Sequence, residues 1–441
     1  MRILLVASSA REHAIADALS RSPQKPEIIA VCTTQNPGLK KLSTELHVGN
    51  ILDFPWVMEI AKKTKPGLAI VGPDDPIGGG LADLFEAEGI PTMAPKKSLA
   101  RIESSKSFAR DLLQKTVPIA VPKYRVFTSY EPKELNNYIE QDLRGEYVVK
   151  YDALRGGKGV KVSGEHLASV KDGLQYAKEC IEEGGRVVIE EKLIGVEFSL
   201  LSFVSGTQVV DMPAIQDHKR AYAGDTGPNT GGMGTYTDAD HSLPFLKASD
   251  LARAREINRL TAAALLKECN GPFHGILYGG YIAVKDGIRV IEFNARFGDP
   301  EALNVLPLLS SDLVAICQAI TMGELTEDLV KFEKKATVCK YIAPQSYPVS
   351  KDQKGMTVAF PKIPTNARLY FGDISEDKKG TLHLGGSRTA GIVGIGDSIA
   401  EAEMIAEKLC EAVNGPVSFR RDIGTAELIR KRIEMMQSLR L

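Results

Sequence analysis

Apolar residues near the start of the chain fall into short runs, and each run is followed by polar residues and an amphipathic segment. Residues 3–7 are continuously apolar, Ser8 and Ser9 end the run, and residues 11–20 have the periodicity of a helix. Residues 27–32 and 68–71 repeat the apolar run, and we expect a further helix over residues 80–89. Strands buried on both faces that alternate with helices are typical of an open parallel sheet. We therefore predict an α/β fold that begins with such a sheet and binds ligands where its strands end.

The pattern changes after a proline-bearing connection at residues 116–122. Two hairpin-like strands, residues 147–151 and 158–162, flank a glycine-rich turn. Residues 217–236 are rich in Gly, Asn, Thr and Asp, and we expect a long loop there that is functional or disordered. Strands and glycine turns resume after about residue 325, and the chain ends in a charged helix.

Composition excludes several classes of protein. The 441 residues carry 55 Lys and Arg against 56 Asp and Glu, so charge gives no reason to expect nucleic acid or an anionic membrane as a partner. The six cysteines are far apart and form no C-x-x-C pair, which fits neither a zinc cluster nor a disulfide framework. No apolar run approaches the roughly eighteen residues of a spanning helix. We expect a cytoplasmic enzyme without a nucleic-acid or membrane partner.

The segment E-F-N-A-R, residues 292–296, predicts a metal and phosphate site. Glu292 and Asn294 lie two apart in an expected strand, so both side chains leave the same face and offer oxygens to one hard cation. Arg296 falls on that face too, where a guanidinium can stabilise developing negative charge. The alternative is a surface strand with an ion pair. The apolar residues at 293, 295 and 297 and the sharp turn at 298–300 favour the site.

The glycine-rich turn has a lysine on either side, Lys150 on a strand and Lys158 in the turn. Glycines let backbone N–H groups close over phosphates, and the lysines add positive charge. An ordinary glycine hairpin with solvated lysines explains the segment equally well. The spacing is not that of a Walker loop, which disfavours a P-loop enzyme.

An acidic bend follows, in which Glu190 and Glu191 join two expected strands. Such a bend can accept from an adenine amino group, and Glu197 could then accept from ribose hydroxyls. Each glutamate taken singly is better explained as solvated. Their position along the chain, between the lysines and the 292–296 segment, favours the adenosine contact over solvated glutamates.

The segment of residues 217–234 combines Lys219 and Arg220 with clustered glycines. Its backbone donors and small side chains suit anionic groups that move during a reaction, which a passive linker does not need. His218 could be a base, although solvation or a loop hydrogen bond explains it better.

In this order, the motifs resemble those of the ATP-grasp ligases, and the match is close to the phosphoribosylamine-glycine ligase family. D-H-K-R with G-D-T-G-P-N-T-G-G-M-G, and E-F-N-A-R-F-G-D-P-E, carry the resemblance over nearly the whole chain. S-K-S-F-A-R at 105–110, F-R-R-D-I-G at 419–424 and R-E-H-A at 11–14 support it.

The resemblance implies three domains. Residues 1–104 would form an acceptor-binding, Rossmann-like domain of the biotin-carboxylase N type, and residues 105–325 a two-subdomain ATP-grasp domain with a mobile lid at 121–190. Residues 326–441 would resemble the hybrid-motif domain of biotin carboxylase relatives. The implied reaction joins glycine to 5-phosphoribosylamine in purine synthesis, through a glycyl phosphate made from ATP, with Mg²⁺ or Mn²⁺. We expect a monomer, with a weak dimer as the alternative.

The resemblance also implies roles for individual residues. It makes Glu292 and Asn294 the metal ligands, and Arg296, Lys219 and Asp217 the catalytic residues. The implied ATP-binding residues are Lys106, Lys150, Gly156, Gly157, Lys158, Gly159, Glu190, Glu191, Leu193 and Glu197. The implied substrate-binding residues are Ser8, Ser9, Arg11, Glu12, Asn36, Gly38, Asp225, Pro228, Asn229, Thr230, Gly231, Gly232 and Met233.

The chain departs from the family at the first strand-to-helix turn, where Ala7, Ser8, Ser9 and Ala10 stand in place of the family's G-x-G-G. This limits positive φ and backbone approach to a phosphate, although hydroxyls and the helix N-terminus can still donate. Arg155 is a second departure, at a position where the family more often has alanine. A ligase with a different amine acceptor is therefore the alternative. A non-catalytic nucleotide-binding protein is disfavoured because it has no need of the 292–296 segment.

Overall fold

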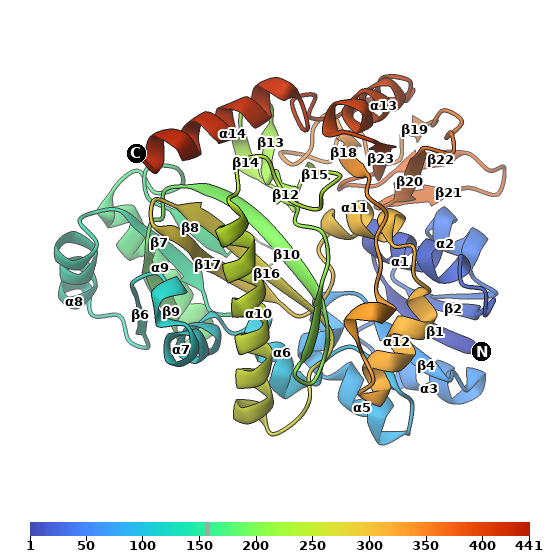
Figure 1. The fold of residues 1–441 in the computed structure, drawn as a ribbon, viewed down its shortest axis with the longest axis horizontal. Coiled ribbons are helices and arrows are strands. Elements are labelled where there is room, and N and C mark those ends of the chain that lie inside the picture. Colours follow the sequence, from blue (N-terminus) through green and yellow to red (C-terminus); the bar gives the residue numbers. More distant parts are fainter. Residues whose placement is uncertain (155–158) are drawn as a thin grey trace.

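The first five strands form a parallel sheet, as the apolar runs predict. The computed structural model describes residues 1–154 and 159–441, and its first sheet has the order β3-β2-β1-β4-β5. Figure 1 shows this sheet and its helices at one end of the molecule. The strands are β1 (Arg2–Ala7), β2 (Glu27–Cys32), β3 (Glu45–Val48), β4 (Leu68–Val71) and β5 (Thr92–Met93). The helices are α1 (Ala10–Ser20), α2 (Pro37–Leu42), α3 (Phe54–Thr64), α4 (Asp74–Gly79) and α5 (Leu81–Ala87).

A second layer, residues 124–191, has an antiparallel sheet of order β6-β9-β7-β8. Helices α6 (Lys97–Ser104) and α7 (Lys106–Thr116) and the 3₁₀ turn η1 (Pro118–Ala120) lead into it. Its elements are β6 (Tyr124–Phe127), α8 (Pro132–Asn137), the π turn η2 (Tyr138–Asp142), β7 (Tyr147–Tyr151), β8 (Val160–Val162), α9 (Val170–Gly184) and β9 (Val187–Glu191). Its buried apolar residues form a cluster of their own, which is what a subdomain needs. The boundaries at 121 and 190 stay a prediction.

The central sheet has the order β11-β10-β16-β17 and carries the predicted metal-binding strand. Its strands are β10 (Val196–Ser205), β11 (Gln208–Asp211), β16 (His274–Val284) and β17 (Gly287–Asn294). The helices of this part are α10 (Ala248–Cys269), α11 (Glu301–Leu308) and α12 (Leu313–Met322), followed by the 3₁₀ turn η3 (Glu327–Leu329).

Residues 217–236 differ from the expected long loop. They contain the hairpin of β13 (Arg220–Tyr222) and β14 (Thr226–Asn229), and they begin and end in β12 (Gln216–Asp217) and β15 (Gly234–Thr237). Strand β15 pairs with β18 (Ala336–Pro344), so two strands from the middle of the chain belong to the C-terminal sheet β12-β15-β18-β23-β20. Long-range pairing of this kind leaves no local signal, because the partner strand is about one hundred residues away.

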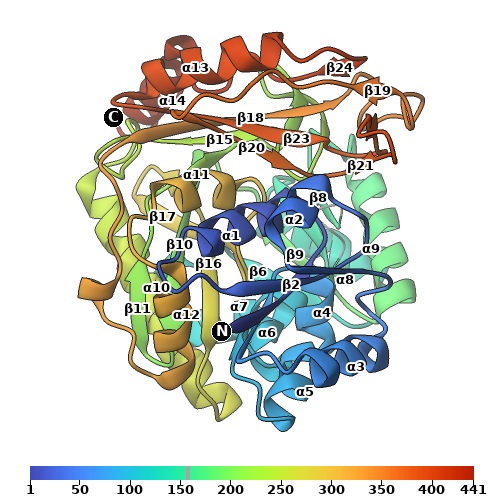
Figure 2. The ribbon, with the colours of Figure 1, turned by 90° about the vertical axis from the view of Figure 1, so that its right-hand side faces the viewer.

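The C-terminal part covers the other layers from one side (Figure 2). Its remaining elements are β19 (Thr357–Val358), β20 (Ala367–Phe371), β21 (Ile374–Glu376), β22 (Leu382–Leu384), β23 (Ala390–Gly396), α13 (Ile399–Glu411), β24 (Val417–Ser418) and α14 (Ala426–Leu439). Helix α14 runs back to pack against β10 and β16 of the central sheet (Figure 1). Among the described residues, no helix is both long enough and apolar enough to cross a membrane.

Candidate active site

A cavity of about 560 Å³ lies where these parts of the molecule meet. The starts of α1 and α4, which follow strands of the first sheet, contribute Ser9, Arg11 and Asp74, and the second layer contributes Lys150. Strand β17 and the segment after it contribute the 292–296 motif, and Arg388 comes from the C-terminal part. Charged side chains from segments far apart in the sequence therefore face one space.

Strand β17 presents Glu292 and Asn294 to this cavity from one face. Phe293 between them is buried on the opposite face, as the alternation predicts. Burial disfavours the charged carboxylate, but Lys219, Lys106 and Lys150 outweigh it and lower the pKa of Glu292 to about 2. Glu292 is thus an anion at neutral pH, as a metal ligand must be.

Arg296 is fixed by Glu103, the penultimate residue of α6. Its guanidinium lies 3.0 Å from the Glu103 carboxylate, whose other oxygen accepts from the backbone N–H of Ala295 at 2.7 Å. Burial opposes the charge, but Glu103 and Asp74 outweigh it and raise the pKa of Arg296 above its ordinary value. Arg296 is therefore a permanent cation beside Asn294, whose side-chain oxygen lies 3.5 Å from it.

Three lysines surround Glu292. Lys219 lies 3.7 Å from its carboxylate and 3.8 Å from that of Glu197. Lys106, the first residue of α7, donates to the backbone carbonyl of Glu103 at 3.0 Å. Lys150 donates to the carbonyl of Ile291 at 3.0 Å, so β17 holds it directly. Converging cations of this kind suit a polyphosphate.

Lys150 is also paired with Glu190, whose two oxygens receive the guanidinium of Arg110. All three side chains are buried. Burial disfavours the Glu190 anion, but Arg110 and Lys150 outweigh it and hold the pKa of Glu190 below its ordinary value. Glu190 therefore neutralises two cations inside the protein.

The segment before β15 closes another wall of the cavity. Asn229, Thr230 and Gly231 line it, and the Thr230 hydroxyl donates to the carbonyl of Lys219 at 2.9 Å. Arg388 donates to the carbonyls of Gly231 and Gly232 at 2.9 and 2.8 Å, which anchors the segment to the C-terminal sheet.

Asp225, in the turn of the β13–β14 hairpin, pairs with Arg420 at 3.0 Å and with Arg432 of α14. Burial raises the pKa of Asp225, but the two arginines outweigh it and bring the pKa below its ordinary value. The ring Nδ1–H of buried His218 donates to the carbonyl of Gly234 at 3.1 Å, and burial lowers the pKa of His218 to about 4. A neutral ring agrees with the loop hydrogen bond expected for His218.

The start of α1 is built around Glu12, which is completely buried. Its carboxylate accepts from the backbone N–H groups of Ser8 and Ser9 at 2.9 and 2.8 Å, and from Arg11. Ser9 has φ −153°, an extended conformation that does not require glycine, and its hydroxyl donates to Asp299 at 2.6 Å. The serines thus fit this turn without strain.

The chain matches the phosphoribosylglycinamide synthetase family over three segments: its N domain at residues 1–103, its ATP-grasp (A) domain at 104–302 and its C domain at 337–426. A phosphoribosylamine–glycine ligase of Methanococcus maripaludis (strain C7) is 45% identical over all of both chains, and one of Methanocaldococcus jannaschii is 44% identical over all of both chains.

The chain belongs to the phosphoribosylglycinamide synthetase family.

Solved structures agree with this membership. A phosphoribosylamine–glycine ligase from Thermotoga maritima has a TM-score of 0.79 at 28% identity, covering 96% of this chain and 100% of its own. The biotin carboxylase of Campylobacter jejuni has a TM-score of 0.71 at 14% identity, covering 99% of this chain and 95% of its own, which is a likeness of fold alone. The predicted α/β class, with its biotin-carboxylase-like arrangement, is confirmed for this member of the phosphoribosylglycinamide synthetase family.

Most of the predicted site residues of this synthetase-family chain line the cavity. They are Ser9, Arg11, Lys106, Lys150, Gly159, Glu197, Asp217, Lys219, Asp225, Asn229, Thr230, Gly231, Glu292, Asn294 and Arg296. Their individual roles stay predictions. Gly156, Gly157 and Lys158, with Arg155, lie outside the described residues.

Three predicted adenosine contacts lie away from the cavity, and their roles stay predictions. The Glu190 carboxylate is occupied by Arg110 and Lys150, and that of Glu191 accepts from the backbone N–H of Lys123 at 2.7 Å. Neither lines the cavity, and neither does Leu193. Sequence gives no sign of these internal partners, so an acidic bend looks the same whether it contacts a ligand or pairs inside the protein.

Seven predicted substrate contacts also lie away from the cavity wall. Asn36 accepts from Gly38 and Leu39 and donates to the carbonyl of Phe371, so it caps α2 and joins it to the C-terminal part. Gly38 packs against the ring of His13, and Gly232 lies beside Asp217. The remaining four are Ser8, Glu12, Pro228 and Met233, of which Met233 is buried in the core.

Several charged residues of the cavity were missed by the sequence analysis. They are Asp74, Glu103, Asp299, Glu301, Arg388 and Arg432. Asp299 and Glu301 stand inside the motif that carried the resemblance, which was the available signal. Arg388 and Arg432 gave none, because only the packing of the C-terminal part brings them to the cavity.

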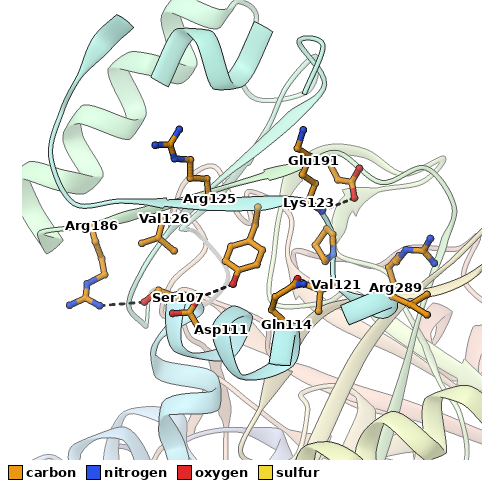
Figure 3. Close-up of a pocket in the computed structure, with 13 residues that line it drawn as sticks. Ser107, Asp111, Gln114, Val121, Lys123, Arg125, Val126, Arg186, Glu191 and Arg289 are labelled. Atoms are coloured by element: carbon orange, nitrogen blue, oxygen red, sulfur yellow. Dashed lines mark hydrogen bonds between the residues drawn. The ribbon is translucent and has the colours of Figure 1, made fainter. Parts of the chain in front are cut away.

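A second hollow, of about 900 Å³, lies between α7 and β6 (Figure 3). Lys123, Arg125 and Arg186 stand on one side of it, and Asp111 accepts from the hydroxyl of Tyr124 at 2.7 Å. Of the predicted site residues that the structure describes, only Glu191 lines it. It contains none of the 292–296 motif and is separate from the candidate active site.

Proposed function

We propose that this protein joins glycine to 5-phosphoribosylamine, with ATP converted to ADP and phosphate, to give glycinamide ribonucleotide for purine synthesis. The observation that carries the proposal is full-length similarity, 45% over all of both chains, to a phosphoribosylamine–glycine ligase. The cavity adds chemical support because it combines an ionised carboxylate, an amide oxygen and several fixed cations.

The reaction has two steps. The γ-phosphoryl group passes from ATP to a carboxylate oxygen of glycine, and ADP leaves. The amine nitrogen of phosphoribosylamine then attacks the carbonyl carbon, phosphate leaves, and the nitrogen loses a proton. Such chemistry depends on alignment, on charge stabilisation and on excluding water from the acyl phosphate.

The cations of the cavity have distinct roles in this proposal. Lys106 and Lys150 bind the phosphates of ATP, and Lys150 is oriented by Glu190 and Ile291. Arg296 and Lys219 stabilise the charge that develops on the transferring phosphoryl group. Arg296 is already held in place by Glu103, so little reorganisation is needed during the reaction.

Glu292 and Asn294 are the residues that would hold a divalent metal. An ionised carboxylate and an amide oxygen on one face suit Mg²⁺ or Mn²⁺, which usually complete their coordination with water and substrate phosphates. Among the described residues, no group of three or more His, Cys, Asp or Glu side chains could hold a metal. A bound metal supplies charge neutralisation at the phosphates.

In this proposal Ser9, Arg11 and Thr230 bind the acceptor. Ser9 and Arg11 come from the start of α1, and Thr230 comes from the segment anchored by Arg388. The ligase with a different amine acceptor remains the competing proposal, and the similarity to phosphoribosylamine–glycine ligases does not favour it.

The test is product formation by the purified protein. Incubation with ATP, MgCl₂, glycine and freshly prepared 5-phosphoribosylamine should give glycinamide ribonucleotide, ADP and phosphate in equal amounts, detected by mass spectrometry and phosphate assay. Arg296→Gln should be inactive. Arg289→Gln, on the strand that leads to Arg296 but lining the second hollow, should keep its activity. ATP consumption with another amine but not with phosphoribosylamine would establish the competing proposal instead.

A further inference from the structure

Asp152 joins the second layer to helix α7 beside the cavity. It follows β7, two residues after Lys150, and its side chain is only 2% exposed. Its Oδ1 accepts from the backbone N–H of Ser107 at 3.0 Å and from the hydroxyl of Ser105 at 3.2 Å. Its Oδ2 accepts from the hydroxyl of Ser107 at 2.5 Å, and the exposed Arg186 lies 3.6 Å away. One buried carboxylate thus receives three donors from another part of the chain.

These donors belong to the bend between α6 and α7, which carries Lys106. Helix α6 ends at Ser104, and α7 begins at Lys106 with Ser105 as its N-cap. The N–H of Ser107 lies in the first turn of α7, where no carbonyl of the helix can accept from it. Asp152 supplies the missing acceptor from outside the helix, and its negative charge suits the helix N-terminus.

The same bend sets the position of two cations of the cavity. Nζ of Lys106 donates to the backbone carbonyl of Glu103 at 3.0 Å, and the carboxylate of Glu103 pairs with Arg296. Both Lys106 and Arg296 line the cavity. A displacement of the bend would therefore move Lys106 together with the partner that fixes Arg296.

The strand on the other side of the contact is tied to the cavity as well. Lys150 leaves the chain on the same side as Asp152, because side chains of a strand repeat every two residues. Lys150 is paired with Glu190, which also binds Arg110 of α7. Helix α7 is thus held to this layer at its start by Asp152 and one turn further on by Glu190.

We propose that Asp152 is a positioning residue for ATP binding, which holds the start of α7 so that the ammonium groups of Lys106 and Lys150 contact one polyphosphate. This inference rests on the proposed function, which assigns the phosphates of ATP to these two lysines. Asp152 does not itself line the cavity, so it acts through Lys106 and not on the nucleotide. A carboxylate that only capped α7 would stabilise the fold and leave the affinity for ATP unaltered.

The experiment measures the dissociation constant for ATP by isothermal titration calorimetry, with MgCl₂ present and glycine absent. Asp152→Ala should raise this constant about ten-fold, because Lys106 is no longer held in place. In a Lys106→Ala background, Asp152→Ala should raise it less than about two-fold, since the lysine that Asp152 positions is already gone. This non-additivity separates a positioning role from a general loss of stability.

Asp172→Ala is the matched control. The Asp172 carboxylate accepts from the backbone N–H and the hydroxyl of Ser169 at 2.9 Å each, at the exposed start of α9 in the same layer. Its loss removes the same kind of contact from a helix start that lies outside the cavity, so the dissociation constant for ATP should stay at the wild-type value.

Ser107→Ala is a milder variant, which removes one hydroxyl and keeps the backbone donor to Asp152. It should raise the dissociation constant for ATP about two- to five-fold, and it tests the contact even where Asp152→Ala fails to fold. An unchanged constant in Ser107→Ala or in Lys106→Ala, or equal factors for Asp152→Ala with and without Lys106, would overturn the positioning role. ATP binding with the expected pattern, but no glycinamide ribonucleotide from wild-type protein, would instead reject the proposed function alone.

Discussion

Nζ of Lys150 lies 2.7 Å from Oε2 of Glu190, and both side chains are almost completely buried. The same carboxylate accepts hydrogen bonds from the guanidinium of Arg110, so one anion neutralises two cations. Of the two, Lys150 faces the cavity. A buried pair of this kind costs much to break, because a charge is left without compensation.

We expect Glu190→Gln to lower the free energy of unfolding by about 3–5 kcal/mol and to raise the Michaelis constant for ATP, since Lys150 loses its fixed partner. Urea unfolding and steady-state kinetics measure the two effects. Glu179→Gln, exposed on α9 of the same layer, is the control and should change neither. An unchanged free energy of unfolding in Glu190→Gln would show that the ion pairs of Glu190 with Lys150 and Arg110 do not stabilise the fold.

Glu292→Gln should remove most metal-dependent turnover while leaving the fold intact. Its carboxylate is ionised at neutral pH because the surrounding lysines lower its pKa to about 2, and loss of this anion should raise the barrier by several kcal/mol. Turnover is measured across a MgCl₂ titration, with circular dichroism as the check on folding. Glu268→Gln, exposed on α10, is the control. Near-wild-type turnover of Glu292→Gln at saturating magnesium would remove the metal assignment.

His13 should make stability depend on pH in the acidic range. Its Nδ1 accepts from the backbone N–H of Phe371 at 2.8 Å, and burial lowers its pKa from 6.5 to about 3. Between these two values the unfolded chain binds a proton that the folded protein does not, so stability is lost as pH falls from 6.5. The loss attributable to His13 is about 1.4 kcal/mol per pH unit.

We expect His13→Gln to flatten this dependence, because the amide oxygen can accept from Phe371 without titrating. Urea unfolding at several pH values between 6.5 and 4 gives the slope. His47→Gln, at a half-exposed position, serves as the control and should retain the wild-type slope. An equal slope in wild type and His13→Gln would show that His13 contributes nothing to acid sensitivity.

The pairing of Asp225 with Arg432 should hold the β13–β14 hairpin against the C-terminal helix. Arg432→Gln is expected to increase amide hydrogen exchange over residues 220–229 about five- to ten-fold, because a partly buried ion pair is lost while Arg420 still contacts Asp225. Exchange measured by mass spectrometry tests this. Arg430→Gln, on the exposed face of the same helix, should leave exchange unchanged. Equal amide exchange over residues 220–229 in Arg432→Gln and Arg430→Gln would show that the Asp225–Arg432 ion pair does not hold the hairpin.

Features that depend on local periodicity could be predicted from the amino-acid sequence. The apolar run of β1 and the alternation in β17 fixed a parallel opening sheet and placed Glu292 and Asn294 on one face, because a strand repeats every two residues. The amino-acid types at residues 292–296 and in the segment before β15 also indicated a site for a metal and phosphate groups. Few purely structural roles need that mixture of charged side chains, amides and glycines.

Which charged side chains are free to contact a ligand depends on the packing of distant segments and could not be predicted from the sequence. Glu190 and Glu197 look alike in sequence, yet one is enclosed by Arg110 and Lys150 and the other faces the cavity. Asn36 is used to join two parts of the chain, and Arg388 reaches the cavity from more than 150 positions beyond Gly231. The physical reason is that an ionic or hydrogen-bonding partner is chosen by distance in space, and long-range packing sets that distance.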